Sequence, residues 1–205
     1  MDRSVIADES RDSNPVSVDY YLIENFLPKP RASKLLDLFS DELDWQQQEI
    51  FLYGRKVMQP RLTCWFADPG VEYAYSGLKL IARPWHPELQ KLRVQLQNKM
   101  GHSFNSVLAN AYRSGKDSMG WHSDDEKELG SQPVIASISL GASRKFKMKS
   151  RDGSEKQDFQ LGSGSLFVMQ NRCQARYRHA VPKTAKKVGL RINLTFRLIK
   201  NQPLR

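Results

Sequence analysis

The sequence has little cysteine and no long apolar run, and both absences narrow the class of protein. Two cysteines, Cys64 and Cys173, cannot build a disulfide scaffold, and there is no Cys-x-x-Cys pair. The N-terminal residues 1–22 have no apolar core and predict neither a signal peptide nor a membrane span. We therefore expect a cytoplasmic protein, or a nuclear one in a eukaryote, that acts without a membrane.

Internal repeats and low-complexity tracts are also missing, and the composition is that of a folded chain. Of the 205 residues 40% are hydrophobic and 10% aromatic, which predicts a globular domain with a full core. We expect a flexible tail over 1–17, helices and a recognition lid over 18–102, and the catalytic core of the same domain over 103–201.

Acidic residues become scarce toward the C-terminus. Residues 141–205 carry 16 Lys and Arg against 3 acids, a balance of +13, whereas residues 1–140 carry 16 against 19, a balance of −3. A strongly basic segment within one domain indicates a polyanionic partner, nucleic acid first, although a solubility surface is an equal alternative.

The apolar periodicity predicts two helices followed by many short strands. In segment 29–45 the apolar residues recur at helical spacing, with Ser33 as a candidate N-cap. In segment 86–102 a second apolar stripe predicts a helix that ends at Gly101. After about residue 104 the pattern becomes one of strands separated by turns, at 104–113, 134–141, 144–149, 156–161, 164–169, 176–182 and 189–199. The expected fold class is mainly β with supporting helices, a β-sandwich or jelly roll with the helices on one sheet.

Two of these strands have one polar face. In 191–198 the residues Ile192, Leu194, Phe196 and Leu198 alternate with Arg191, Asn193, Thr195 and Arg197, so one face is apolar core. In 107–112 the same alternation places Leu108, Asn110 and Tyr112 opposite three small residues. If these polar faces line a cavity, they favour a ligand with anionic groups.

Histidine is scarce as well, with four in the chain, and one lies beside a run of acids. His122 and Asp124 are one residue apart, and Asp125 and Glu126 follow. A solvated acidic turn would explain the run, and so would a metal site with a third ligand. His179 lies on another predicted strand, 55 residues after Asp124. Two histidines and one carboxylate form the facial triad typical of non-haem Fe(II) oxygenases.

Several motifs occur in a characteristic order: "NAY" at 110–112, "GWHSDDE" at 120–126, "IASISLGASRKF" at 135–146, "GSLFVM" at 164–169, "RYRHAVP" at 176–182 and "RINLTFR" at 191–197. In order and spacing, over roughly residues 50–200, they resemble the AlkB family of Fe(II)- and 2-oxoglutarate-dependent dioxygenases. Segment 60–77 is similar to the nucleic-acid repair members. The resemblance implies a double-stranded β-helix, which is a jelly roll, with Fe(II), O2 and the co-substrate 2-oxoglutarate.

The resemblance also assigns residues by position. It implies that His122, Asp124 and His179 bind iron. It implies that Arg191 pairs with the distal carboxylate of 2-oxoglutarate and that Arg197 lies near the carboxylate at the metal. The remaining residues of this pocket would be Asn110 and Tyr112, which hydrogen-bond the co-substrate, with Asn193 and Thr195 in the wall.

For the substrate, the resemblance implies that Asp125 accepts a hydrogen bond from the exocyclic amine of a flipped base. Glu126 would support it, or would be a solvated turn carboxylate. Tyr73, Tyr75 and Ser76 match a segment whose aromatic rings stack on the extruded base.

Segment 51–61 matches a hairpin that covers the substrate in this family. There Tyr53 would be wedged into the gap left by the base, beside Gly54, with Arg55 and Arg61 on nearby phosphates. The animal repair members have Phe-Gly where this chain has Tyr-Gly. The exchange keeps the ring and adds a hydroxyl.

The expected function is oxidative demethylation of 1-methyladenine and 3-methylcytosine in DNA repair, with release of formaldehyde, succinate and CO2. Alkylated DNA, or RNA, would be the partner of a monomer without an obligate protein partner. One alternative is the same chemistry on RNA or protein. Another is a non-catalytic nucleic-acid-binding protein with a structural metal.

Overall fold

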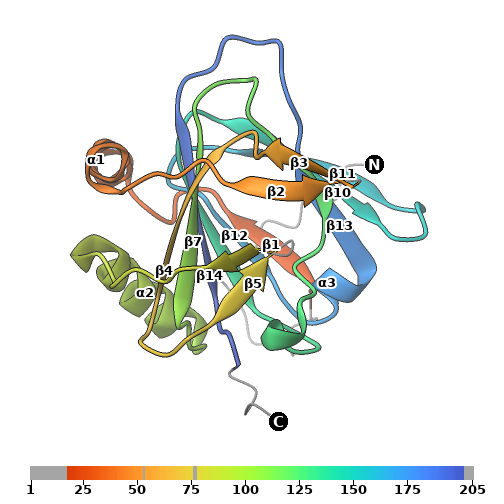
Figure 1. Cartoon of the computed structure of the whole chain (residues 1–205), viewed down its shortest axis with the longest axis horizontal. Helices are drawn as coiled ribbons and strands as arrows, with labels where there is room; N and C mark the ends of the chain where they lie inside the picture. The colour runs from red at the N-terminus through yellow and green to blue at the C-terminus, as the bar shows by residue number, and fades with distance from the viewer. Residues whose placement is uncertain (1–17, 53, 76–77, 201–205) are drawn as a thin grey trace, which may run out of the picture.

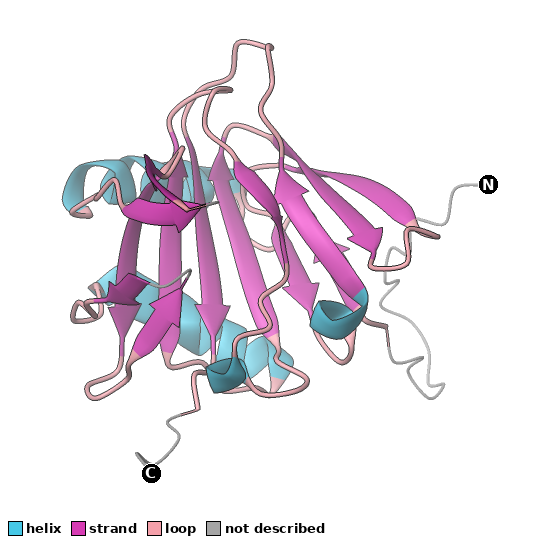
Figure 2. Ribbon diagram, turned by 45° about the vertical axis from the view of Figure 1, so that its right-hand side comes forward, coloured by secondary structure: helices cyan, strands magenta, loops and turns pink. Residues whose placement is uncertain are grey.

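Two antiparallel sheets form most of the computed structural model, which describes residues 18–52, 54–75 and 78–200 (Figures 1 and 2). The six-stranded sheet has the order β1 (Tyr20–Ile23), β12 (Leu166–Met169), β9 (Ile135–Gly141), β14 (Arg191–Arg197), β7 (Ser106–Tyr112) and β4 (Leu62–Ala67). The four-stranded sheet has the order β11 (Lys156–Leu161), β10 (Arg144–Ser150), β13 (Tyr177–Val181) and β8 (Met119–His122).

Strands that are consecutive in the sequence pass between the two sheets, which is the jelly-roll arrangement that the sequence predicted. β7 belongs to the six-stranded sheet and β8 to the four-stranded sheet, and β13 and β14 repeat the exchange. β8 and β4 are edge strands of their sheets. Two hairpins, β2 (Glu49–Leu52) with β3 (Arg55–Met58) and β5 (Tyr73–Tyr75) with β6 (Leu78–Leu80), form separate small sheets.

Both predicted helices cover the outer face of the six-stranded sheet, α1 (Lys29–Glu42) and α2 (Pro87–Met100) (Figure 1). Their buried Leu35, Phe39, Leu89, Leu92 and Leu96 belong to the same apolar cluster as the outer-face residues of β7, β9 and β14. Burial of this cluster is what fixes the helices on the sheet. The prediction of helices on one sheet is confirmed.

The helix boundaries correct one prediction and confirm another. Ser33 is not an N-cap, because α1 already begins at Lys29, and Pro30 is tolerated within the first turn. α2 ends at Gly101, whose φ of 60° is the left-handed conformation expected of a C-terminal stop. His86 is structural: its Nδ1 accepts from the Glu88 amide at 3.1 Å.

The alternation predicted for β14 and β7 is present. Ile192, Leu194 and Phe196 face the helices, with Ala109 and Ala111 of the neighbouring strand. Small residues on β7 let the sheet approach the helices closely. The polar side chains of both strands point the other way, into the space between the sheets.

All seven strands predicted after residue 104 exist, with shifted ends. The hairpin of β2 and β3 falls where the family resemblance implied a covering hairpin. The strands β1, β4, β5, β6 and β8, and the one-turn helix α3 (Cys173–Arg176), were not predicted, because elements of three to six residues carry little periodicity. Cys64 and Cys173 are buried free thiols. No helix in the described part of the chain is long and apolar enough to cross a membrane.

Candidate active site

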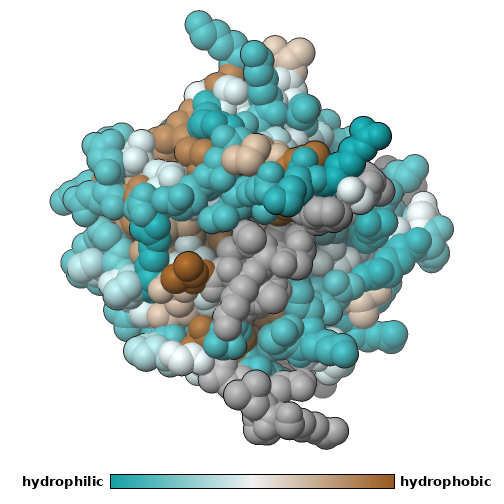
Figure 3. All heavy atoms as spheres, in the orientation of Figure 1, coloured by the Kyte–Doolittle hydropathy of each residue, from teal (hydrophilic) through white to brown (hydrophobic). Residues whose placement is uncertain are grey.

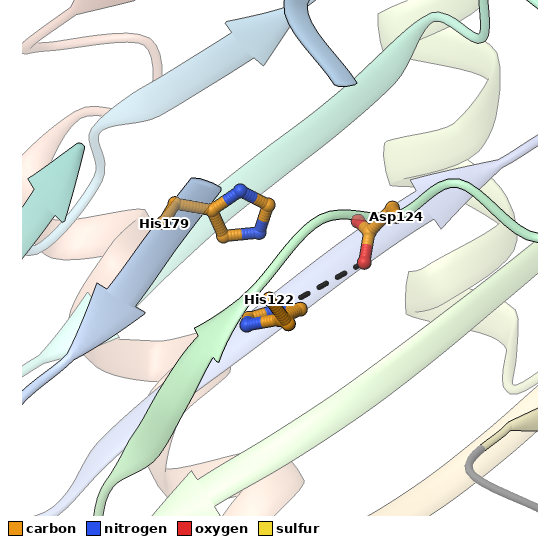
Figure 4. A group of neighbouring side chains, drawn as sticks. All are labelled: His122, Asp124 and His179. Carbon is orange, nitrogen blue, oxygen red and sulfur yellow. Dashed lines mark ion pairs between the residues drawn. The ribbon is translucent and has the colours of Figure 1, made fainter. Parts of the chain in front are cut away.

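The three predicted iron ligands meet between the sheets (Figure 4). His122 is the last residue of β8, Asp124 follows in the loop, and His179 comes from β13, where it pairs in register with His122. One ligand atom from each residue lies within 4.8 Å of the other two. The imidazole centroids are 4.2 Å apart, and His122 Nε2 is 3.7 Å from Asp124 Oδ1. β8 ends at His122, so the two members of the His-x-Asp pair lie on either side of the strand end.

The charge states of these side chains suit a divalent cation. Burial lowers the pKa of His179 to about 3, and burial also lowers the pKa of His122, so both imidazoles are neutral near pH 7. Burial alone would raise the pKa of Asp124, but the Arg197 guanidinium lowers it below its ordinary value. Two neutral nitrogen donors and one carboxylate are the ligand set that Fe(II) takes in oxygenases.

Two buried atoms of this group have no hydrogen-bond partner in the described structure, Asp124 Oδ1 and His179 Nδ1. Buried polar atoms are normally satisfied, and the unpaired Asp124 Oδ1 lies 3.7 Å from His122 Nε2, so this oxygen is available to a cation held between the carboxylate and the imidazoles. The residues therefore fit a bound iron ion.

The loop that carries Asp124 is held by several contacts. Arg197 Nη2 donates to Asp124 Oδ2 at 2.9 Å, and both side chains are buried. The Asp124 amide donates to Gln174 Oε1 at 2.8 Å, and His122 Nδ1 lies 2.9 Å from the Gly120 carbonyl oxygen. Such contacts fix the orientation of the ligands before any metal binds.

Next to the triad lies a polar cavity, and its far wall is a buried arginine. Arg191 is 2% exposed; its Nη2 donates to Ser139 Oγ at 2.9 Å, whereas its Nε and Nη1 have no hydrogen-bond partner in the described structure. Burial lowers the pKa of this guanidinium, since charge is unfavourable there without an anion. A carboxylate on the Nη1–Nη2 edge or on the Nε–Nη2 edge of the guanidinium would give one of these donors a charged partner.

The other predicted co-substrate residues line the same cavity. Asn193 Nδ2 donates to Ser137 Oγ at 2.7 Å, and Thr195 Oγ1 donates to Asn193 Oδ1 at 2.9 Å. Asn110 Oδ1 accepts from Arg61 Nε at 2.8 Å. These contacts leave a preorganised polar wall rather than a set of free side chains.

Arg61 lies elsewhere than the sequence suggested. It is 3% exposed and lines this cavity, so its guanidinium cannot reach a phosphate at the surface. The bond to Asn110 makes it part of the co-substrate wall.

A further buried arginine, Arg144, was missed from the sequence. It donates to the carbonyl oxygens of Ser114 at 3.0 Å and of Asp117 and Pro182 at 2.8 Å. The guanidiniums of Arg144 and Arg191 lie 5.7 and 5.2 Å from the centre of the Tyr112 ring. Arg144 thus ties the two loops at this end of the cavity together, beside Tyr112.

The residues predicted to bind the substrate do not gather in one place, unlike the predicted ligands of iron and of the co-substrate. Asp125 is exposed, and its Oδ2 accepts from Arg151 Nη2 at 2.6 Å, away from the cavity. Glu126 is partly buried. Arg55 is exposed on the β2–β3 hairpin, and Gly54, with φ of 76°, makes its turn. Tyr53 and Ser76 lie outside the described residues, and for Tyr73 and Tyr75 only the backbone of β5 is described.

A second cavity, of about 260 Å³, lies on the other side of Leu108, which lines both cavities. Its wall comes from β4, from the segment before β2 and from the segment after β6: Gln46, Gln48, Thr63, Cys64, Trp65, Ile81 and Arg83. Sequence reasoning missed this set, because its members come from three separate segments and share no motif.

A jelly roll with two imidazoles and a carboxylate beside a buried arginine that keeps two donors without a partner among the described residues defines a non-haem iron oxygenase that takes an anionic co-substrate. Residues 19–197 match the family described as the 2OG-Fe(II) oxygenase superfamily, and the chain belongs to this superfamily. Its cofactors are therefore Fe(II), 2-oxoglutarate and O2, and the AlkB resemblance is confirmed by the curated relatives.

Among these relatives, alpha-ketoglutarate-dependent dioxygenase alkB homolog 3 of Homo sapiens is 36% identical over 192 residues, covering 89% of this chain and 66% of that protein. The match thus spans slightly less than two thirds of the human protein. DNA oxidative demethylase ALKBH2 of Mus musculus is 32% identical over 195 residues, covering 90% of this chain and 80% of that protein.

Solved structures share the fold. OsALKBH1 has a TM-score of 0.63 at 16% identity, covering 90% of this chain and 100% of that chain. A prolyl-4-hydroxylase of Pseudomonas putida has a TM-score of 0.57 at 17% identity, covering 91% and 95%. The predicted jelly-roll fold is confirmed.

Proposed function

We propose that this protein removes methyl groups oxidatively from alkylated nucleic-acid bases of the 1-methyladenine and 3-methylcytosine type. The observation that carries the proposal is the buried Arg191, with two unpaired donors, in the same cavity as His122, Asp124 and His179. When bound, Fe(II) and 2-oxoglutarate supply the oxidising power that inserts one oxygen atom of O2 into the methyl C–H bond. The hydroxymethyl base then loses formaldehyde, and succinate and CO2 leave as co-products.

The chain's own residues bind and orient. His122, Asp124 and His179 would hold the iron, with Asp124 fixed by Arg197. Arg191 would clamp the distal carboxylate of 2-oxoglutarate, with Asn110, Tyr112, Asn193, Thr195 and Arg197 along the cavity and Arg61 behind Asn110. The closed wall would keep bulk water away from the reacting carbon.

The second cavity is the candidate base-binding pocket. It shares the lining residue Leu108 with the first cavity, and it combines an indole, Trp65, with polar groups such as Thr63. Flipped bases are held by stacking and by hydrogen bonds to their polar edge, which this lining can supply. Tyr53, Tyr73, Tyr75 and Ser76 stay candidates for the lid over this pocket.

In this proposal Asp125 and Glu126 keep their role at the exocyclic amine, and Gly54 and Arg55 keep theirs in the covering hairpin. Asp125 would have to leave Arg151 to reach a base. Since their ion pair is largely exposed, it is weak, and exchanging partners costs little.

A nucleic-acid substrate is favoured by the net charge of +10 and by the relatives named as demethylases of DNA. RNA is the second candidate, because the same base edge and phosphates are present there. Action as a monomer in the cytoplasm or nucleus belongs to the same proposal.

The test is formaldehyde release from an oligonucleotide that carries one 1-methyladenine, with Fe(II), ascorbate and 2-oxoglutarate. Matched reactions use His122→Ala and an unmethylated strand. Release that needs the lesion, the co-substrate and His122 supports the proposal. Succinate formation without formaldehyde would retain the oxygenase and reject this substrate class, and an iron-loaded protein that forms neither would be a binding protein with a structural metal.

A further inference from the structure

The outer face of the four-stranded sheet carries cations in direct register. Lys149 of β10 lies opposite Lys156 of β11 on one side and opposite Arg178 of β13 on the other. Their sequence neighbours Met148, Tyr177 and His179 are buried between the sheets, so these three side chains point outward. We call Lys149, Lys156 and Arg178, together with the exposed Trp121, the basic row.

Like charges directly opposite on neighbouring strands destabilise a sheet. Nearby, the sheet avoids this cost: Asp158 Oδ2 lies 3.0 Å from Lys145 Nζ and 3.9 Å from Lys147 Nζ. Among the described residues no acid pairs with the cations of the basic row: Glu155 is engaged by Arg176 and by the Tyr177 hydroxyl, and Asp125 by Arg151. The charge of Lys145 and Lys147 is thus partly compensated by a carboxylate, whereas that of the basic row is not, which indicates an anionic ligand for the row.

Trp121 places an aromatic ring at the end of this row. Its side chain is 37% exposed, Lys149 Nζ lies 4.4 Å from the ring centre, and Arg178 Nη2 donates to its carbonyl oxygen at 3.0 Å. It precedes His122, and β8 is the edge strand beside the iron site. The row therefore begins at the edge strand that carries the proposed iron ligand His122 and runs from there across the outer face of the sheet, over a side of the molecule that is largely hydrophilic (right in Figure 3).

We propose that the basic row binds the single-stranded flank of the nucleic acid whose modified base occupies the active site. This inference rests on the proposed function. Lys149, Lys156 and Arg178 contact successive phosphates, and a base beside the lesion stacks on Trp121. Cationic tracks with interspersed aromatic rings are how proteins hold single strands without reading their sequence. The row extends the substrate site from one base to a strand.

The test compares two double variants that each remove two lysines from the same sheet. Lys149→Ala/Lys156→Ala removes the row, and Lys145→Ala/Lys147→Ala is the matched control. Binding to fluorescent single strands of about 15 nucleotides and to a trinucleotide is measured over a range of salt. We expect the row variant to bind the long strand about tenfold more weakly than the control, with a salt slope smaller by about 1.4. The trinucleotide should distinguish the two variants by less than about twofold.

Trp121→Leu tests the stacking contact separately. It should weaken binding of the long strand by about tenfold while leaving the salt dependence unchanged, because a ring carries no charge. Lys156→Thr tests the register argument without any ligand. It should raise the thermal midpoint by about 1 to 3 °C through relief of the repulsion with Lys149.

If both double variants lose the same affinity for the long strand, only the overall positive charge of the face matters, and the row would be rejected. A duplex that binds more tightly than the single strand, with the same dependence on the row, would reject a single-stranded partner. If the natural chain demethylates the long strand but the variants do not differ, the row fails and the proposed function stands. If binding depends on the row but no methylated base is converted, the proposed function fails and the row stands as a binding surface for single strands.

Discussion

Arg197 and Asp124 form a buried ion pair, with Nη2 and Oδ2 2.9 Å apart, that connects the last residue of β14 to the proposed iron ligand. Each charge compensates the other where water cannot. The pair therefore couples the central sheet to the metal site, and its loss should lower both the stability of the fold and the affinity for iron.

Replacing one partner of this pair tests that coupling. Arg197→Met should lower the free energy of unfolding by about 3 to 5 kcal/mol, because the Asp124 carboxylate is left buried and unpaired. It should also weaken Fe(II) binding, since Oδ2 loses the contact that orients it. Urea unfolding of metal-free protein and an iron titration measure the two effects. Unchanged stability would show that Asp124 finds another donor.

Arg191 should give the opposite stability effect. Arg191→Met removes a buried guanidinium with two unpaired donors, so the free energy of unfolding of the co-substrate-free protein should rise by about 1 to 2 kcal/mol. Affinity for 2-oxoglutarate should fall by about a hundredfold through loss of two charge-assisted hydrogen bonds. Arg191→Lys should also weaken binding, because an ammonium cannot form the planar fork. Calorimetry without O2 measures affinity; Ser139→Ala, which leaves the guanidinium in place, is the control.

Arg144 should affect co-substrate binding indirectly, by holding in place the loops that flank Tyr112. Arg144→Met leaves the carbonyl oxygens of Ser114, Asp117 and Pro182 without this donor, which should cost about 3 kcal/mol of stability. Because these loops flank Tyr112, KM for 2-oxoglutarate should rise about tenfold while kcat changes less. A variant with lower kcat and unchanged KM would contradict this positioning role.

The metal-free protein should lose stability on acidification. The pKa of His179 is about 3 in the fold and about 6.5 in an unfolded chain, so the unfolded state binds the extra proton. Its contribution is present above pH 6.5 and is lost as the pH falls toward 3, by up to about 1.4 kcal/mol per pH unit. Urea unfolding with chelator between pH 7 and 4 measures the slope. His179→Gln should have a shallower slope than the natural chain.

The sequence was informative where a pattern repeats within one element. The alternation in β14 predicted its apolar face and placed Arg191 and Arg197 together on the other face, and the family resemblance assigned that face to the cavity. The strand pattern predicted the jelly roll. The metal triad was found because iron needs specific ligand types, and the chain has only four histidines.

Contacts between distant segments could not be predicted in this way. Arg61 was read as a surface cation, but it bonds to Asn110, 49 residues away. Asp125 is joined to Arg151 and Arg144 to Pro182 across loops whose paths no local pattern encodes. Charged residues look alike in sequence whether they are buried or solvated, so their partners emerge only from the fold.

β14 is hydrogen-bonded on both sides, to β7 and to β9, along nearly its whole length. Arg191 and Arg197 stand at its two ends, six residues apart, about 20 Å along an extended strand. A strand held in this way cannot stretch, so the separation of the two Cα atoms is constant. The strand therefore fixes the base of the Arg191 side chain relative to the Arg197–Asp124 pair at the metal site, and diacids one carbon shorter or longer than 2-oxoglutarate should bind more weakly.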